Sequence, residues 1–184
     1  MVEPVLLALL VAAIGRLKIR GIFRRWELYP MLFLVLTYIF CQITIFMNNY
    51  YFIRFTIPMK FAFLAVLIII IFRNRLYHSY YTVAALLLYI AGSVMNRIVV
   101  AANGNRMPVF PSLTLKTGYL DMEVIRQSGM HIIGDENVRY KWLSDIFDVG
   151  YSVMSLGDIL IRLCVFMILL LFIYSVSSKT ELAV

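Results

Sequence analysis

The stretch YPMLFLVLTYIFCQITIFM, residues 29–47, contains no charged side chain and decides the class of the protein. Its length matches the roughly 20 apolar residues that a helix needs to cross a bilayer. Pro30 lies in the first turn, where a proline is tolerated because its missing N–H would have no helical partner there. The pattern therefore predicts a transmembrane helix over 29–47.

Four further apolar runs lie around it, at residues 2–15, 55–72, 82–102 and 151–174. The first is too short for an ordinary span, since a crossing helix needs at least about 17 residues, so it is short or re-entrant. Only 15% of the residues are charged, against about a quarter in soluble domains. We expect a single membrane domain over 1–184, an all-α integral membrane helical bundle with about five transmembrane helices.

Basic residues follow the first run at once and indicate the orientation. They are Arg16, Lys18, Arg20, Arg24 and Arg25. Basic residues beside spans stay on the cytoplasmic side, and no nucleic-acid recognition module accompanies this charge. Because the acidic residue precedes the first run and the basic ones follow it, the run is typical of an anchor and not of a cleavable signal. We expect the N-terminus outside, the C-terminus in the cytoplasm, and membrane lipids but no nucleic acid as partners.

The longest polar segment, 104–150, then becomes a structured extracytoplasmic loop, and the charges beside it are site candidates. Arg97, Asp158 and Arg162 lie inside spans, where an ionisable group is costly unless it is paired or functional. Asp158 and Arg162 are four residues apart, so they share a helix face and can pair. One interpretation is an ion pair that joins two helices. The other is that Asp158 faces an outward-open cavity, beside the small Ser155 and Gly157.

The sequence NGNRMPV, residues 103–109, ends the predicted fourth helix. Asn-Gly favours a turn with positive φ, and Pro108 favours an extended Met107. The turn would hold Arg106 at the membrane surface. It is either a capped turn with a headgroup contact, or it presents the planar guanidinium of Arg106 to a carboxylate or phosphate.

A third candidate is WLSDIFD, residues 142–148. If it is helical, Asp145 and Asp148 share a face of an amphipathic segment lying on the bilayer. His131 and Asp135 lie upstream of it. One histidine with scattered acids is a weak signal, because zinc takes three or four protein ligands. We therefore predict neither a metal site nor a cofactor.

These short elements resemble a family of bacterial membrane proteins, the domain-of-unknown-function family 5317. The family patterns are Asn-Gly-Gly-Arg-Met-Pro-Val at 103–109, Leu-Gly-Asp at 143–145 and Ser-Ile-Gly-Asp-Ile/Val-Leu at 155–160. The junction Gly15-Arg16-Leu17 and His131 also match. Asn105 and Ser144 stand where the patterns have glycine. The resemblance implies no activity.

A looser resemblance is to the lipoprotein signal peptidases, which are small membrane aspartic proteases. The sequence AGSVMNR, 91–97, resembles their first motif, Gly-Asn-x-x-Asp-Arg, but Val99 stands where the acid is expected. The sequence SLGD, 155–158, resembles their second motif. An aspartic mechanism needs two carboxylates that share a proton. The catalytic candidates are therefore Asp145 and Asp158.

The preferred hypothesis is that an outward-facing polar pocket binds a ligand, a lipid or a partner, without catalysis. Its candidate residues are Arg97, Asn103, Arg106, His131, Asp145, Asp158 and Arg162. One alternative is a membrane-embedded aspartic hydrolase. Another is a small subunit of a membrane complex, whose partner is a further membrane protein.

Overall fold

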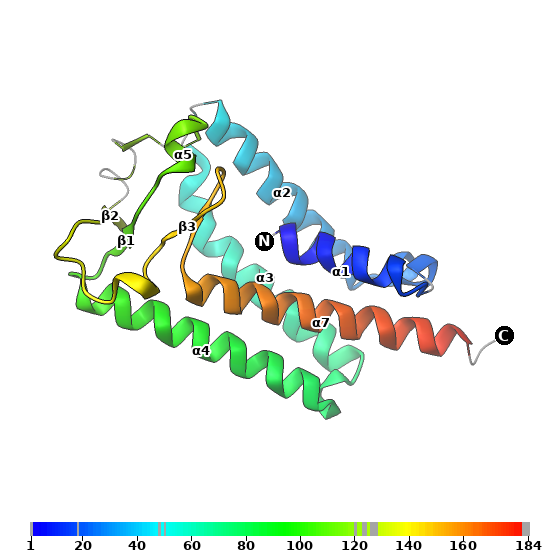
Figure 1. Cartoon of the computed structure of the whole chain (residues 1–184). Helices are drawn as coiled ribbons and strands as arrows, with labels where there is room; N and C mark the ends of the chain where they lie inside the picture. Colours follow the sequence, from blue (N-terminus) through cyan, green and yellow to red (C-terminus); the bar gives the residue numbers. More distant parts are fainter. Residues whose placement is uncertain are drawn as a thin grey trace. The chain divides into compact units, whose positions relative to one another are not determined.

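The computed structural model describes residues 2–17, 19–47, 49, 51–119, 121–122, 125 and 129–181. Most of the chain is helical (Figure 1). The long helices are α1 (Val2–Ile14), α2 (Leu28–Phe46), α3 (Thr56–Arg73), α4 (Tyr80–Ala102) and α7 (Leu156–Glu181). The short elements are η1 (Ile19–Arg24), η2 (Tyr51–Phe55), η3 (Leu76–His78), β1 (Met107–Val109), α5 (Leu113–Lys116), β2 (His131–Ile133), η4 (Lys141–Leu143), β3 (Phe147–Asp148) and β4 (Val153–Met154).

The chain divides into two compact units. Unit 1 comprises Met1–Cys41, Phe52–Leu87 and Arg162–Val184. Unit 2 comprises Gln42–Tyr51 and Leu88–Ile161. Helices α2, α4 and α7 each contribute to both units. The candidate residues 97–158 therefore belong to unit 2, and Arg162 belongs to unit 1.

Among the described residues, three helices are long and apolar enough to cross a membrane, which confirms the helical membrane class. They are Leu28–Phe46, Tyr80–Ala102 and Leu156–Ser178. Helix α3 has 18 residues and covers the predicted run 55–72 except for its first residue. Helix α1 has 13 residues, a length of about 20 Å at 1.5 Å per residue. It is therefore shorter than the hydrocarbon layer, which is about 30 Å thick.

Helix α7 begins later than the predicted span 151–174. Val153–Met154 form β4, which pairs antiparallel with β3, so the chain is extended immediately before the helix. The helix begins at Leu156 because the Ser155 hydroxyl accepts a hydrogen bond from the backbone N–H of Asp158 at 2.9 Å. This contact satisfies an N–H that has no partner within the first turn.

Unit 1 holds its helix ends together with two ion pairs. Arg162 of α7 donates to Glu3 of α1 at 2.8 Å. Arg73, at the end of α3, donates to the buried Glu27 at 3.1 Å, and its guanidinium lies 5.0 Å from the ring centre of Trp26.

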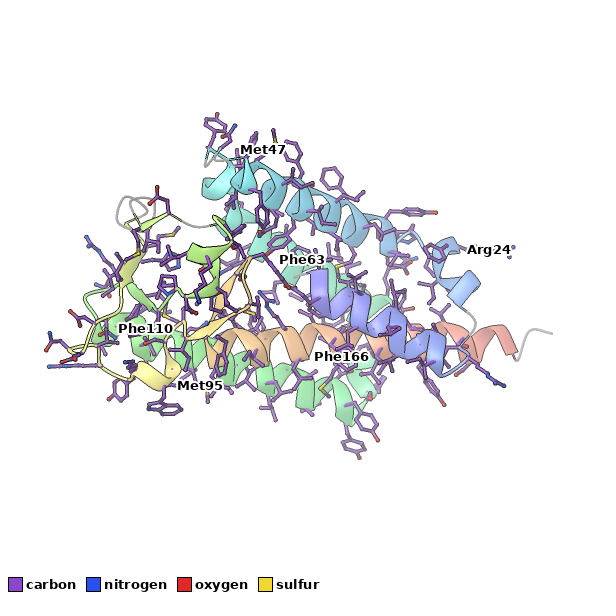
Figure 2. The ribbon with its side chains drawn as sticks, turned by 45° about the horizontal axis from the view of Figure 1, so that its top comes forward. Arg24, Met47, Phe63, Met95, Phe110 and Phe166 are labelled. Atoms are coloured by element: carbon purple, nitrogen blue, oxygen red, sulfur yellow. The ribbon has the colours of Figure 1, made fainter. Side chains whose placement is uncertain are left out.

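Of the predicted basic cluster, Lys18 lies outside the described residues and the side chain of Arg20 outside the described side chains. Arg24 is exposed and points away from η1 (Figure 2).

Unit 2 contains small pieces of sheet in the polar segment. β1 pairs in parallel with β2, with Met107 opposite His131. The chain then returns to β1, where Asp145 bridges Val109. The condition that 142–148 is helical is not met: within it only the 3-10 turn Lys141–Leu143 is helical, and Phe147–Asp148 is a strand. The backbone hydrogen bonds between 145–148 and the neighbouring strands replace those of a helix.

Candidate functional site

A polar cluster of Asn96, Ser155 and Asp158 joins α4 to the start of α7 in unit 2. The Asn96 amide donates to the Asp158 carboxylate at 3.0 Å. The Ser155 hydroxyl donates to the Asn96 side-chain oxygen at 2.7 Å. The Ser155 N–H also approaches the Asp158 carboxylate, at 3.5 Å. Ser155 and Asp158 thus form a reciprocal capping box at the first turn of α7.

Two glycines bring the same helices into backbone contact. A Cβ atom at Gly157 would overlap the Asn96 side-chain oxygen and the backbone oxygen of Gly92. A Cβ atom at Gly92 would in turn overlap the backbone oxygen of Gly157. Small residues permit this approach, and buried polar side chains then hydrogen-bond across the two helices. Each residue of the Ser-x-Gly-Asp sequence therefore has a structural role. Ser155 caps α7, Gly157 permits the close approach of α4, and Asp158 accepts a hydrogen bond from Asn96.

The structure does not pair Asp158 with Arg162 as the four-residue spacing suggested. In the described part of the chain, Arg162 pairs with Glu3, whereas Asp158 accepts from Asn96. Arg97 is exposed on α4, because one residue along a helix is a turn of about 100° away from the face that carries Asn96. The aspartic-hydrolase hypothesis gains no support from these contacts, since the partners shown for Asp158 are an amide and a helix cap.

Replacing Ser155 with alanine should lower stability by about 1–2 kcal/mol, because it removes the helix cap and the donor to Asn96. For a chain of this size the melting temperature should fall by about 3–6 °C. Thermal unfolding in detergent, followed by circular dichroism, measures the change. Ser152→Ala is the control, since among the described residues the hydrogen bond shown for Ser152 is to its backbone oxygen, from the N–H of Val149. Equal melting temperatures for the two variants would contradict the assigned role.

Asn103 joins the end of α4 to the backbone of Arg139, and its role as a ligand contact stays a prediction. Its amide donates to Val99 at 2.8 Å and to the backbone oxygen of Arg139 at 3.0 Å. Its side-chain oxygen accepts from the Arg139 N–H at 3.0 Å. The predicted positive-φ turn is confirmed, with Gly104 at 66° and Asn105 at 61°. Asn103 thus ends α4 and fixes the backbone of Arg139, while Arg106 is exposed in the turn.

Residues Arg139, Tyr140, Lys141 and Trp142 follow this contact and form an exposed basic and aromatic surface, called the 139–142 surface. Tyr140 is 51% exposed and Trp142 is 61% exposed. Tyr140 has a φ of 56°, a conformation that is uncommon for a non-glycine residue. The next residue, Leu143, is buried and packs with Val99 and Met107. The backbone beneath the surface is therefore fixed at both ends.

The ring of Phe110 contacts Lys141 of the 139–142 surface. The Lys141 ammonium lies 4.8 Å from the centre of the Phe110 ring, close enough for a cation–π attraction. The tip of the same ring leaves no room for a Cβ atom at Gly134. The Lys141 ammonium thus lies over an aromatic ring that is itself closely packed against the backbone of Gly134.

Asp148 organises the other part of the polar segment. Its carboxylate accepts from the N–H of Ser112 at 2.6 Å, of Thr114 at 2.9 Å and of Gly150 at 2.9 Å. The Thr114 hydroxyl also donates to it at 2.9 Å. Burial by itself would raise the pKa of the Asp148 carboxyl. The N–H groups outweigh burial and lower that pKa from its ordinary value of 3.8 to about 2.

The remaining candidates lie in the sheet. His131 is half-buried and begins β2. Asp145 is buried, its N–H donates to Pro108, and its backbone oxygen accepts from Phe110. The described residues contain no group of three His, Cys, Asp or Glu side chains that could hold a metal ion. Asp145 and His131 are therefore placed by backbone pairing, and the structure leaves their role as ligand contacts a prediction.

Sequence reasoning missed Asn96 and the 139–142 surface. Asn96 had a signal, because it lies four residues after Gly92 and so on the same helix face. The 139–142 surface had a weaker signal, namely two aromatic and two basic residues in succession. The use of Asp148 as a tertiary cap had none, because Ser112 and Thr114 lie more than thirty residues away in sequence.

The chain was compared with protein families, curated proteins and solved structures. The model of a family of unknown function, DUF5317, matches residues 5–170. No curated protein and no solved structure is significantly similar to the chain.

Proposed function

The chain belongs to the DUF5317 family of unknown function, and we propose that it is a multi-pass membrane protein that binds a partner protein through the 139–142 surface. The basic cluster at 16–25 favours a cytoplasmic position for η1. Residues 103–155 connect α4 to α7 and are called the 103–155 segment. If the spans alternate in direction, this segment lies on the extracytoplasmic side. Binding by this segment, without catalysis, is the function that the geometry supports best.

The length of the 103–155 segment supports a role beyond connection. Gly157, at the start of α7, contacts Gly92, which lies ten residues before the end of α4. Ten helical residues span about 15 Å, a distance that a short connection could cover. Connections between helices typically have about 2–8 residues, and much longer loops in compact domains are usually functional. Here the segment is many times longer and carries its own sheet pairs and tertiary hydrogen bonds.

The single observation that carries the proposal is the exposure of Tyr140 and Trp142 on a fixed backbone. Exposed Trp, Tyr and Arg side chains are enriched among the residues that contribute most to protein interfaces. Asn103 and the buried Leu143 hold the backbone on either side. Because that backbone is already ordered, a partner would lose less conformational entropy on binding.

Photo-crosslinking in the native host membrane tests the proposal. A photoreactive phenylalanine analogue at position 142 should yield a discrete protein adduct, and the same analogue at the exposed position 116 of α5 should not. Once the adduct is identified, Trp142→Ala should weaken binding of the purified partner about 30-fold or more, the loss expected of a dominant interface residue. Lys116→Ala should leave the dissociation constant unchanged.

A lipid adduct alone from position 142 would overturn the proposal. Trp142 would then be an aromatic anchor at the membrane interface, a common position for tryptophan in membrane proteins. A protein adduct in fixed stoichiometry would instead support the small-subunit form of the same hypothesis.

A further inference from the structure

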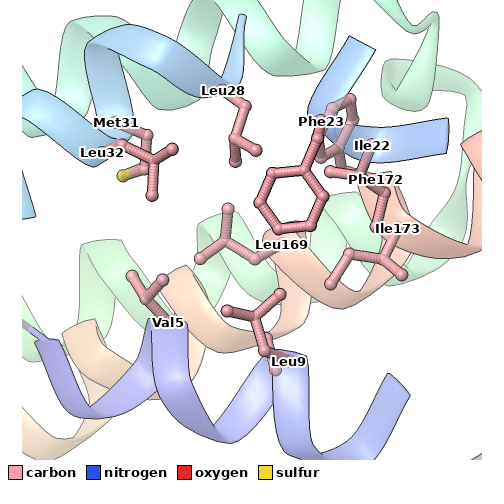
Figure 3. A pocket seen from close by; sticks show the side chains of 11 residues that line it. Val5, Leu9, Ile22, Phe23, Leu28, Met31, Leu32, Leu169, Phe172 and Ile173 are labelled. Carbon is pink, nitrogen blue, oxygen red and sulfur yellow. The ribbon is translucent and has the colours of Figure 1, made fainter. Parts of the chain in front are cut away.

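A small apolar cavity of about 30 Å³ lies inside unit 1 (Figure 3). Four elements line it, namely α1, η1, α2 and α7, and all of the lining side chains are apolar. In Figure 3, Leu9 of α1 points toward the ring of Phe23, with Leu28 and Leu169 beside it. Phe23 is 52% exposed, so the cavity has a wall at the protein surface.

Water is a poor occupant for this space. A cavity of this size has room for about one water molecule, but a buried water needs two to four polar partners. The lining provides none. A hydrocarbon segment can enter without losing hydrogen bonds and gains dispersion contacts with the wall. The surface beside Phe23 therefore suits an acyl chain, part of which enters the cavity.

Positive charge lies directly beside the apolar lining. Arg24 and Arg25 follow Phe23 in the chain, and Arg16 is exposed at the end of α1. Among the described side chains, none of these three arginines has an ion-pair partner. The nearby Glu27 is 3% exposed and is already paired with Arg73. The charge is thus available to an anion from outside the protein.

We propose that unit 1 binds an anionic phospholipid at this place. The headgroup phosphate contacts Arg24 and Arg25, because a guanidinium can donate two parallel hydrogen bonds to phosphate oxygens. One acyl chain lies against Phe23, with part of it in the cavity beside Leu9. A water-soluble phosphate would leave the apolar lining unused, which favours a lipid. The site lies in unit 1 and is independent of the 139–142 surface.

Native mass spectrometry of the full chain tests the proposal. The detergent-solubilised protein is mixed with equal amounts of phosphatidylglycerol and phosphatidylcholine that carry the same acyl chains. The wild type should retain phosphatidylglycerol about 30-fold over phosphatidylcholine, a preference of the size that two arginines near a headgroup provide. R24Q/R25Q should abolish that preference. L9F, which fills the cavity, should lower retention of both lipids several-fold and keep the preference.

Matched variants separate this site from a general effect of charge or hydrophobicity. R97Q/K116Q removes two exposed positive charges from unit 2, and L10F enlarges a side chain that is 56% exposed on α1. Both should behave as the wild type. An equal loss of preference in R97Q/K116Q, or wild-type retention in L9F, would overturn the site. If R24Q/R25Q does not fold, the wild type decides the question: its preference should fall as salt screens the arginines, and a preference that does not change with salt would refute the headgroup contact.

Discussion

Replacing Gly157 with alanine should lower the stability of the protein by about 3 kcal/mol, toward the upper end for overpacking of a close contact. The added Cβ would overlap the backbone oxygen of Gly92 and the side-chain oxygen of Asn96. A backbone atom cannot rotate away, so α4 and α7 must separate. Their separation also weakens the hydrogen bonds of Asn96 to Ser155 and Asp158.

Thermal unfolding in detergent, followed by circular dichroism, measures this effect, and the melting temperature should fall by about 6–12 °C. Gly15→Ala is the control. Its Cβ would lie 3.3 Å from the nearest atom, the backbone oxygen of Val11, which is a tight but tolerable contact. If both alanine variants melt within a degree of each other, the close approach of α4 and α7 at Gly157 is wrong.

The helices could be predicted from the sequence because their signal is local. A run of apolar residues such as 29–47 needs no knowledge of its neighbours, and α2 covers nearly the same residues. The sequence signal for the turn after α4 is equally local. Gly104 and Asn105 adopt positive φ as their types suggest, and Met107 is extended before Pro108. In each of these places the residue type restricts its own backbone.

The contacts of the charged residues could not be predicted in the same way. Asp158 and Arg162 share a helix, and spacing alone favours their pairing. In the structure, Arg162 instead pairs with Glu3, and Asp158 accepts a hydrogen bond from Asn96. Both partners are distant in the chain, so the packing of the helices decides which contacts form. The structure of segment 142–148 could not be predicted for a related reason. Its apolar spacing suits a short helix, but pairing with β1 and β4 gives its backbone more partners.

The structure adds contacts at both ends of the polar segment that the sequence did not indicate. Near Asp158 these contacts are a helix cap and a close approach of two helices. Near Asn103 the turn leaves Arg106 exposed, and the Asn103 side chain also positions the backbone of Arg139. The exposed residues 139–142 thus depend on tertiary contacts for their position. Asp148 makes contacts of the same kind elsewhere in the segment, with Ser112 and Thr114.

Replacing Asp148 with asparagine should loosen the 103–155 segment by about 2 kcal/mol, because hydrogen bonds to a charged acceptor are the stronger ones. Asparagine offers one acceptor oxygen where Asp148 offers two, and its NH₂ group would face donors. Hydrogen exchange of the Ser112, Thr114 and Gly150 amides should become roughly 30-fold faster, since exchange reports the free energy of local opening. Asp135→Asn is the control, because in the described part of the chain Asp135 accepts one exposed hydrogen bond, from the N–H of Asn137.

The same carboxylate predicts a dependence on pH with a definite sign. Its pKa is about 2 in the folded chain, below the ordinary value of 3.8. The stabilisation is therefore complete above about pH 4 and is lost as the pH falls toward 2, where Asp148 takes up a proton in both states. The chemical shift of the Thr114 amide should follow this transition in the wild type and stay constant in Asp148→Asn. A midpoint near 4 in the wild type, or an unchanged transition in the variant, would show that Asp148 does not hold Ser112, Thr114 and Gly150 together.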